Sequence, residues 1–351
     1  MNCCAECFGD RGLRRYVIPL RSTARRRCSY CRTDDVAIVA PRDLAIYFES
    51  LTGAYRQDTA GKLLVQWFRE DWALFQHPRM MDDSRANRLL TEILDDGEIV
   101  QQQFVPASDP TVDRLGEWEK LRDELMYHNR YFPEATIDLK RLRDLLVPLT
   151  LDFDEIPTQW YRARIQTGDN PIPAREMGAP PRRIASHGRA NPAGIPYLYL
   201  GSNPVTAISE IRPHTGERAC VAEFTPRRRL RIVDLRNPRK MVSPFLLGAI
   251  DIGRMRNDLP FLERLGAELT RPVLPQAAAV DYTPSQYLCE FIKNCGYKGV
   301  IYRSSVGDGI NLALFDPKLA RCGTVTQHDV TRVIVEIAAG SQPAGASRRT
   351  R

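Results

Sequence analysis

Apolar side chains recur three or four residues apart along the first half of the chain, a spacing typical of amphipathic helices. The segments with this spacing are 41–48, 62–68, 84–94, 116–127 and 138–146. Pro41 occupies a helix-opening position, and Pro148 is expected to close the region. The pattern predicts an all-α domain over residues 36–148.

After Pro148 the pattern changes to short alternating or apolar runs separated by helical stretches. We expect strands at 159–165, 197–200, 220–224, 230–235, 300–302, 311–315 and 330–337, and helices at 203–212, 244–268 and 283–295. Residues 168–194 are rich in Pro, Gly and Arg, and long loops of this kind are often functional. Because strands and helices interleave without strict alternation, the fold class is α+β, with a mixed sheet over residues 149–337 and a disordered basic tail over 338–351.

Composition changes this picture little. The chain has 351 residues, of which 43% are hydrophobic and 26% charged, as expected for a globular protein with a packed core. No apolar run is long enough to cross a membrane or to act as a signal peptide, so we expect a cytoplasmic protein. The net charge of +7 is concentrated in local arginine runs, which either lie on solvated faces or attract an anion such as a dinucleotide or RNA.

Four cysteines near the start of the chain form two C-x2-C pairs, Cys4 with Cys7 and Cys28 with Cys31. In a cytosolic chain this arrangement favours a metal over disulfides. Two such turns complete a tetrahedral sulfur site, so residues 1–35 are predicted to be a zinc-binding module. Four sulfur ligands leave no place for a water, so the zinc would be structural; Cys3 is a spare that could replace Cys4.

Several residues of the second half suggest a binding site for an anion. Arg162 lies inside an aromatic-flanked strand, where a buried guanidinium is costly unless it meets an anion, although an arginine at a strand edge would reach water. Gly188 and Arg189 lie in the long loop, where a flexible backbone allows close approach to a phosphate. Glu210 lies on an apolar helix and Ser304 follows a strand, both positions where a polar side chain usually has a partner or a role.

The order and spacing of these segments resemble the RES domain family, named for its Arg, Glu and Ser. The matching segments are Tyr161-Arg162, 188–194, 197–200, 207–210, 285–288, 299–304 and 311–316, and the resemblance covers roughly residues 155–337. It implies a fold related to ADP-ribosyltransferase toxins and NAD as the substrate. Members of the family degrade NAD by hydrolysis or phosphorolysis, or transfer ADP-ribose to a protein.

The resemblance also implies roles for individual residues. Arg162 and Arg189 would hold the pyrophosphate or ribose, and Tyr199 would stack on nicotinamide. Glu210 would bind a ribose hydroxyl and stabilise the cationic sugar, and Ser304 would complete the pocket. Gln286 and Asn311 are further candidates for NAD binding.

The chemistry of NAD cleavage suits these residue types. Breaking the N-glycosidic bond builds positive charge on the ribose ring, so a nearby carboxylate stabilises the transition state more than the ground state. Nicotinamide leaves as a neutral molecule and needs no general acid. Bidentate arginines match the oxygens of the diphosphate, and an aromatic face can hold the flat leaving group.

Two features depart from the family pattern. Ala190 follows the Gly-Arg pair where many members carry a large aromatic residue, and the chain has a long N-terminal extension that compact RES toxins lack. This extension resembles the zinc-ribbon and HEPN-like part of some longer RES proteins. A toxin or defence effector that drains NAD needs restraint, by the N-terminal half or by an antitoxin-like inhibitor.

Two other functions stay open at the level of sequence. HEPN folds can be RNases that use an Arg and a His on one helix, here Arg122 and His128, but residues six apart share a helix face poorly. The alternative is a non-catalytic module whose zinc ribbon and arginine runs bind nucleic acid.

Overall fold

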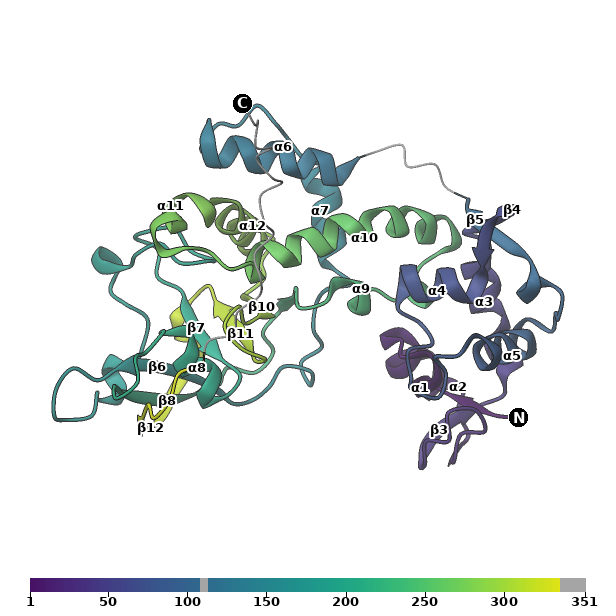
Figure 1. Cartoon of the computed structure of the whole chain (residues 1–351), viewed down its shortest axis with the longest axis horizontal. Helices are drawn as coiled ribbons and strands as arrows, with labels where there is room; N and C mark the ends of the chain where they lie inside the picture. Colours follow the sequence, from purple (N-terminus) through teal and green to yellow (C-terminus); the bar gives the residue numbers. More distant parts are fainter. Residues whose placement is uncertain (108–112, 335–351) are drawn as a thin grey trace, which may run out of the picture.

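A seven-stranded mixed sheet dominates the C-terminal half of the computed structural model, which describes residues 1–107 and 113–334 (Figure 1). The strand order is β12-β8-β6-β7-β11-β10-β9. Among the described residues, β9 and β10 are the only neighbouring strands of this sheet that run parallel to each other. The strands are β6 (Trp160–Ile165), β7 (Leu198–Gly201), β8 (Arg218–Pro226), β9 (Ile232–Asp234), β10 (Gly299–Arg303), β11 (Ile310–Leu314) and β12 (Ala320–Asp329). The expectation of a mixed sheet is confirmed.

Alternation along the strands separates the two faces of the sheet. Tyr199 and Tyr302 face a core shared with the helices, whereas Leu198, Leu200 and Ile301 face a second core under the long loop. The helices of this half are α8 (Pro204–Glu210), α9 (Pro238–Met241), α10 (Ala249–Thr270), α11 (Ala278–Asp281) and α12 (Thr283–Asn294). Helices α10 and α12 pack on β10, and α8 packs on β6 and β7. The predicted helices of this half are thus present, with ends shifted by a few residues.

The N-terminal residues form a small sheet with order β1-β3-β2 next to short helical turns. Its elements are β1 (Cys3–Cys4), α1 (Ala5–Phe8), the π-helical turn η1 (Leu13–Val17), α2 (Ile18–Arg21), β2 (Ala24–Arg26) and β3 (Val36–Val39). Then follow α3 (Ala45–Thr52), β4 (Tyr55–Leu63), α4 (Leu64–Trp72), α5 (Asp83–Leu94), β5 (Gln103–Pro106), α6 (Arg114–Tyr127) and α7 (Leu139–Leu146).

The prediction of an all-α region over residues 36–148 is therefore wrong in part. Strand β3 lies inside it, and β4 pairs antiparallel with β5. Most side chains of β4 are polar and at least partly exposed, so the strand lacks an apolar alternation. Its partner is also some forty residues further along the chain, and a local pattern carries no signal for such a distant pairing.

The last strand is also misplaced by the sequence pattern. Strand β12 ends at Asp329, whereas residues 330–334 form no strand and the rest of the predicted span 330–337 lies outside the described residues. The polar sequence of β12 and the register shift between Cys322 and Val325 hide its alternation. The predicted basic tail, 338–351, also lies outside the described residues.

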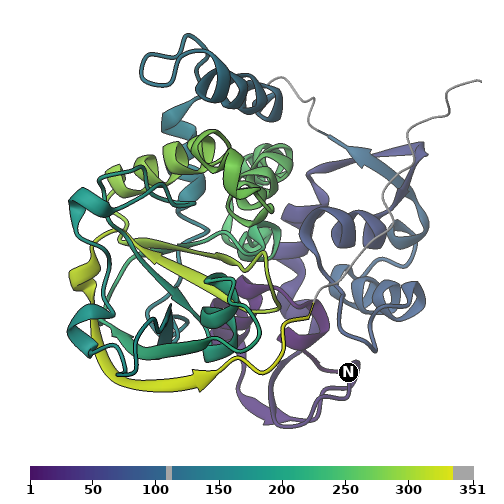
Figure 2. The same cartoon turned by 60° about the vertical axis from the view of Figure 1, so that its left-hand side comes forward.

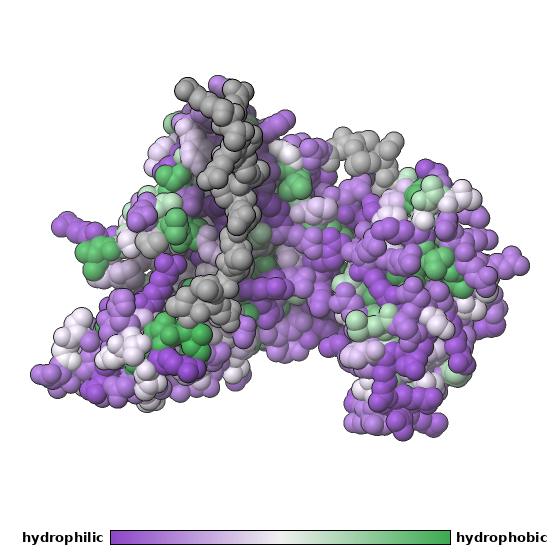
Figure 3. Space-filling view, viewed as in Figure 1, coloured by the Kyte–Doolittle hydropathy of each residue, from purple (hydrophilic) through white to green (hydrophobic). Residues whose placement is uncertain are grey.

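Helix α10 connects the two halves of the molecule (Figures 1 and 2). It contacts α12 and β10 of the C-terminal half and α3 and α6 of the N-terminal half. Buried side chains from the cysteine-rich segment, the N-terminal helices and the sheet form one continuous core. Polar residues dominate the face seen in Figure 3, with apolar ones scattered among them. Across the described residues, no helix combines the length and the apolar character that crossing a membrane requires.

Candidate active site

A cavity of about 460 Å³ opens where β6, β7 and β11 meet helix α8 and the segment leading into α12. Five of the residues predicted from the sequence line it: Arg162, Arg189, Tyr199, Glu210 and Asn311. They come from three strands, one helix and the long loop. The fold thus gathers in one place side chains that are up to 149 positions apart in the chain, as Arg162 and Asn311 are.

Glu210 is the acidic group of the cavity. It is the last residue of α8, which begins at Pro204 behind the Asn203 cap. Ser304 Oγ donates to Glu210 Oε1 at 2.7 Å, and Asn311 Nδ2 donates to the same oxygen at 2.6 Å. Two donors on one oxygen fix the orientation of the carboxylate. Within the described residues these hydrogen bonds engage only Oε1, so Oε2 can face a ligand.

Arg162 lies in the middle of β6 and is nearly buried. Its Nη1 donates to the carbonyl oxygen of Tyr199 at 3.1 Å, while its buried Nε has no hydrogen-bond partner. Burial, and secondarily the charge of Arg164, lowers the pKa of Arg162 to about 10. Arg162 is still protonated at neutral pH, so it is a buried cation for which no carboxylate partner is found among the described residues. A buried charge of this kind is costly unless an anion binds beside it.

Arg189 supplies a second cation. Its Nη1 donates to the carbonyl oxygen of Arg271 at 2.6 Å and its Nη2 to Ser305 Oγ at 3.1 Å. Its guanidinium carbon lies 5.3 Å from the centre of the Tyr282 ring. These contacts are neutral, so they aim the guanidinium without cancelling its charge.

Tyr199 and Gln286 hold the loop that carries Arg189. The Tyr199 hydroxyl donates to Asn191 Oδ1 at 2.7 Å and accepts from the backbone of Ala190 at 2.9 Å. Burial raises the pKa of Tyr199, which keeps it a donor. Gln286 Nε2 donates to the carbonyl oxygens of Gly188 and Asn191 at 2.9 and 3.0 Å. A Cβ at Gly188 would meet both Asn191 Oδ1 and the Tyr199 hydroxyl, so only glycine fits there.

Two predicted site residues, Ser304 and Gln286, do not line the cavity, and neither does Ala190. Ser304 is buried and does not line this cavity; it lines a neighbouring hollow and touches the site through Glu210. Gln286 supports the loop from behind. Ala190 is fully buried and donates its backbone N–H to Tyr199, so the missing aromatic leaves no opening at that position.

The sequence pattern missed other residues of the cavity. They include His187, Arg212, Tyr282, Tyr302 and Ser305. Tyr282 immediately precedes the helix-opening pair Thr283-Pro284, and groups at a helix start often face ligands, which is a signal that could have found it. Burial raises the pKa of Tyr302 well above its ordinary value, so it stays neutral.

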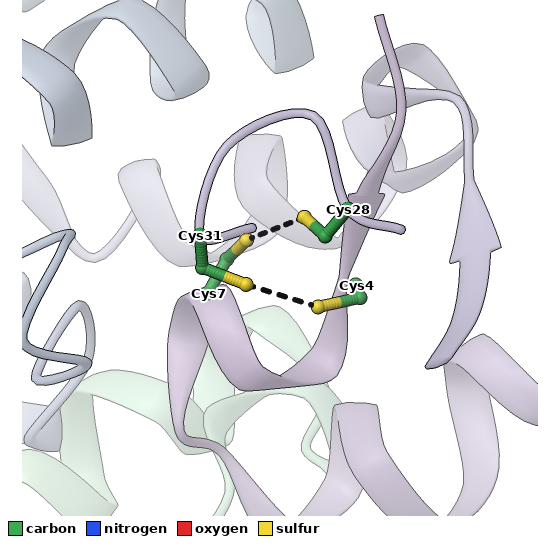
Figure 4. Close-up of side chains that lie close together, drawn as sticks. All are labelled: Cys4, Cys7, Cys28 and Cys31. Carbon is green, nitrogen blue, oxygen red and sulfur yellow. Dashed lines mark hydrogen bonds between the residues drawn. The ribbon is translucent and has the colours of Figure 1, made fainter. Parts of the chain in front are cut away.

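The four predicted cysteine ligands lie together in the N-terminal module (Figure 4). All four are buried, and their sulfur atoms lie within 4.8 Å of one another. Sγ of Cys4 lies 3.5 Å from that of Cys31, and Sγ of Cys7 lies 3.4 Å from that of Cys28. Cys3 instead points its thiol to the carbonyl oxygen of Val39, at 3.8 Å. The cluster is a possible metal site, and Cys3 is not part of it.

Comparison with known proteins relates the C-terminal half of the chain to one family. Residues 159–332 match the family model of the RES domain. The RES region so defined spans slightly less than half of the chain and contains all the cavity-lining residues named above. None of the curated proteins matches the chain.

Among solved structures, the chain is similar to one described as the crystal structure of the M. tuberculosis MbcT-MbcA toxin-antitoxin complex. The similarity covers 54% of this chain and 92% of that chain, at 15% sequence identity and a TM-score of 0.31.

The two residues of the RNase hypothesis have different surroundings. Arg122 turns inward, where its Nε donates to the buried Glu268 at 2.9 Å. His128 caps the end of α6 and is exposed, 3.5 Å from Asp123. A catalytic Arg–His pair would need both side chains on one accessible surface, which these two do not share.

Proposed function

We propose that this protein consumes NAD by breaking the bond between nicotinamide and ribose. One cavity of the RES region contains both a carboxylate held by two hydrogen-bond donors and two arginines that have no acidic partner among the described residues. This observation carries the proposal. Arg162 and Arg189 supply the charge that a diphosphate needs, and Glu210 supplies the charge that a cationic ribose needs.

The proposed reaction requires little proton transfer by the protein. As the glycosidic bond lengthens, the ribose ring becomes electron-poor and Glu210 stabilises it, while Ser304 and Asn311 keep the carboxylate in place. Nicotinamide departs as a neutral ring that the Tyr199 face can hold. Arg162 and Arg189 bind the diphosphate equally before and during cleavage, so they contribute mainly to substrate binding.

The test is release of nicotinamide from NAD by the purified protein. Glu210→Gln keeps an oxygen acceptor for Ser304 and Asn311 but removes the charge, so we expect kcat to fall roughly 100-fold or more with an unchanged melting temperature. Glu176→Gln, an exposed acid of the same region, is the matched control and should retain full activity. Turnover by Glu210→Gln at the wild-type rate would reject the role of Glu210.

The acceptor of the ADP-ribosyl group follows from the products. ADP-ribose indicates hydrolysis, and ADP-ribose 1″-phosphate formed only with added phosphate indicates phosphorolysis. Labelling of a protein indicates transfer to a side chain.

For the cysteine cluster we propose a structural zinc. Four sulfurs at about 2.3 Å from a tetrahedral zinc would lie about 3.8 Å apart. The observed separations, 3.4 and 3.5 Å for the two nearest pairs and at most 4.8 Å for any, support this size. All four donors are soft thiolates on two turns, which is the donor set that zinc prefers.

The remaining sequence predictions belong to the same proposal. We propose that residues 149–337 form an ADP-ribosyltransferase-like domain, preceded by a HEPN-like part over 36–148 and a zinc module over 1–35. An antitoxin-like inhibitor, a protein acceptor and a role as toxin or defence effector remain predictions, as does nucleic-acid binding by the basic runs. The RNase alternative also remains a prediction, with its arginine, Arg122, paired with the buried Glu268.

A further inference from the structure

Helix α10 carries two buried carboxylates, and both are paired with arginines from the N-terminal half. Asp258 and Glu268 are 0% and 1% exposed. Asp258 accepts hydrogen bonds from Arg114 at 2.7 Å and from Arg141 at 2.9 and 2.7 Å. Glu268 accepts one from Arg122 at 2.9 Å. Because a buried carboxylate is costly without a partner, these arginines fix α6 and α7 against α10.

Glu268 also contacts Arg271, the residue that directly follows α10. Its Oε1 also forms an ion pair with Arg264 Nη1 at 2.6 Å, and its Oε2 forms an ion pair, without a hydrogen bond, with Nε of Arg271 at 3.5 Å. Arg271 in turn donates from Nη2 to the carbonyl oxygen of Asp281 at 2.8 Å. The Arg271 side chain therefore ties the end of α10 to the segment that precedes Tyr282.

Both ends of this connection touch the active-site arginine. The carbonyl oxygen of Arg271 accepts from Arg189 Nη1, and the ring of Tyr282 lies under the Arg189 guanidinium. A movement of Arg271 would shift its carbonyl oxygen, which accepts from Arg189, and through Asp281 would also shift the ring of Tyr282. A continuous set of contacts thus runs from Arg122 through Glu268 and Arg271 to Arg189.

We propose that Arg122 of the N-terminal helix α6 is a positioning residue for Arg189, so that the N-terminal half aligns the phosphate-binding arginine of the RES region. The inference rests on the proposed function, because it assumes that Arg189 binds a diphosphate. In this proposal Arg122 has a role other than RNA cleavage. The N-terminal half supports NAD binding by the RES region, whereas the sequence suggested that it restrains the activity.

The chain contains a matched control for Arg122. Arg114 lies on the same helix, is buried to a similar degree, and pairs with a buried acid of the same α10. The side chains of Arg114 and Arg122 are 21% and 18% exposed. Removal of either arginine leaves its acid with another arginine, Arg141 for Asp258 and Arg264 for Glu268. Only Arg122 is connected to Arg189.

The experiment compares Arg122→Met, Arg114→Met and wild type in two measurements, the affinity for ADP-ribose by calorimetry and the steady-state release of nicotinamide from NAD. We expect Arg122→Met to weaken ADP-ribose binding and to raise KM about fivefold or more, with kcat within about twofold of wild type. Arg114→Met should match wild type in both. Arg122→Lys should restore part of the affinity because it returns a cation to Glu268.

Each outcome decides the inference. Wild-type affinity for ADP-ribose in both Arg122→Met and Arg114→Met would overturn it. The same loss of affinity in both variants would also overturn it, because it would show a merely structural role. A wild-type protein that binds ADP-ribose but releases no nicotinamide would reject the proposed reaction alone, and the affinities would still judge Arg122. A wild-type protein that does not bind ADP-ribose would overturn both.

Discussion

Arg162 illustrates how one residue serves a site at a cost to the fold. Its guanidinium is buried, protonated, and bonded only to a carbonyl oxygen, with Nε unpartnered. Burial without an anion destabilises the free protein, and a bound phosphate would repay that loss. Residues whose environment penalises the folded state in this way are often found at binding sites.

Substitution of Arg162 by methionine should therefore separate stability from binding. We expect Arg162→Met to raise the free energy of unfolding by about 1 kcal/mol or more, because a similarly long apolar side chain replaces an unpaired charge. NAD binding should weaken at least tenfold through loss of a charge-assisted hydrogen bond. Thermal unfolding and calorimetry measure the two effects.

Arg164, two residues along the same strand, is the control for this substitution. It donates to the carbonyl oxygen of Gly178, and the cavity does not include it. Arg164→Met should leave NAD affinity unchanged. An Arg162→Met variant that is less stable than wild type and binds NAD with undiminished affinity would contradict the assignment of Arg162 as a phosphate-binding residue.

The sequence predicted which residues line the cavity better than it predicted the contacts that they make. Arg162, Arg189 and Glu210 converge as expected, since the family motif and the chemistry both specify them. Ser304 and Gln286 contact other protein groups in place of the cavity. Arg271 was missed because it acts through its backbone carbonyl, an atom that every residue type possesses.

At the scale of elements, the junction between η1 and the segment before α10 depends on one buried acid. Asp10 Oδ1 accepts from the backbone N–H of Leu13 at 2.7 Å and from Ser243 Oγ at 2.8 Å. Burial, the largest influence, raises the pKa of Asp10 to about 6, although both hydrogen bonds act to lower it. The folded protein therefore holds a proton on Asp10 at a pH where the unfolded chain has lost it.

This raised pKa predicts a loss of stability as the pH rises. The contribution of Asp10 is fully present below about pH 4, falls as the pH rises, and is lost above about pH 6, with a total change of at most about 3 kcal/mol. Asp10→Asn cannot ionise and should lack this loss. Denaturant unfolding at pH 4, 5, 6 and 7 measures the difference between the two proteins, and a difference that does not vary with pH would contradict the raised pKa.

The elements themselves were predictable where the local pattern was strong. Strands β6, β7, β10 and β11 are apolar or aromatic along one or both faces, and their positions followed from that pattern. Strands β4 and β12 are largely polar and gain their stability from partners far along the chain. A window of neighbouring residues contains no information about such a partner.

At the scale of the whole molecule, the four-cysteine cluster and the RES region share one apolar core. Cys4, Cys7, Cys28 and Cys31 belong to the same buried cluster as Phe245 and Leu259. Arg11 joins the module to the RES side through Glu155, to which its Nε donates at 3.1 Å. Loss of the metal should therefore destabilise more than the first 35 residues.

The metal can be tested by matched cysteine variants. We expect one zinc per chain in the wild type, and Cys28→Ser should lose the metal and lower the melting temperature, since structural zinc contributes directly to folding. Cys3→Ser, which alters the neighbouring thiol outside the cluster, should retain the zinc. Elemental analysis with thermal unfolding measures both, and full zinc content in Cys28→Ser would contradict the four-cysteine site.

The most direct test of the central claim is a crystal structure of Glu210→Gln with NAD, since this variant should bind the substrate without cleaving it. The account predicts the diphosphate against Arg162 and Arg189, the nicotinamide ribose beside residue 210, and nicotinamide near Tyr199. NAD bound elsewhere, or with its diphosphate away from both arginines, would contradict it.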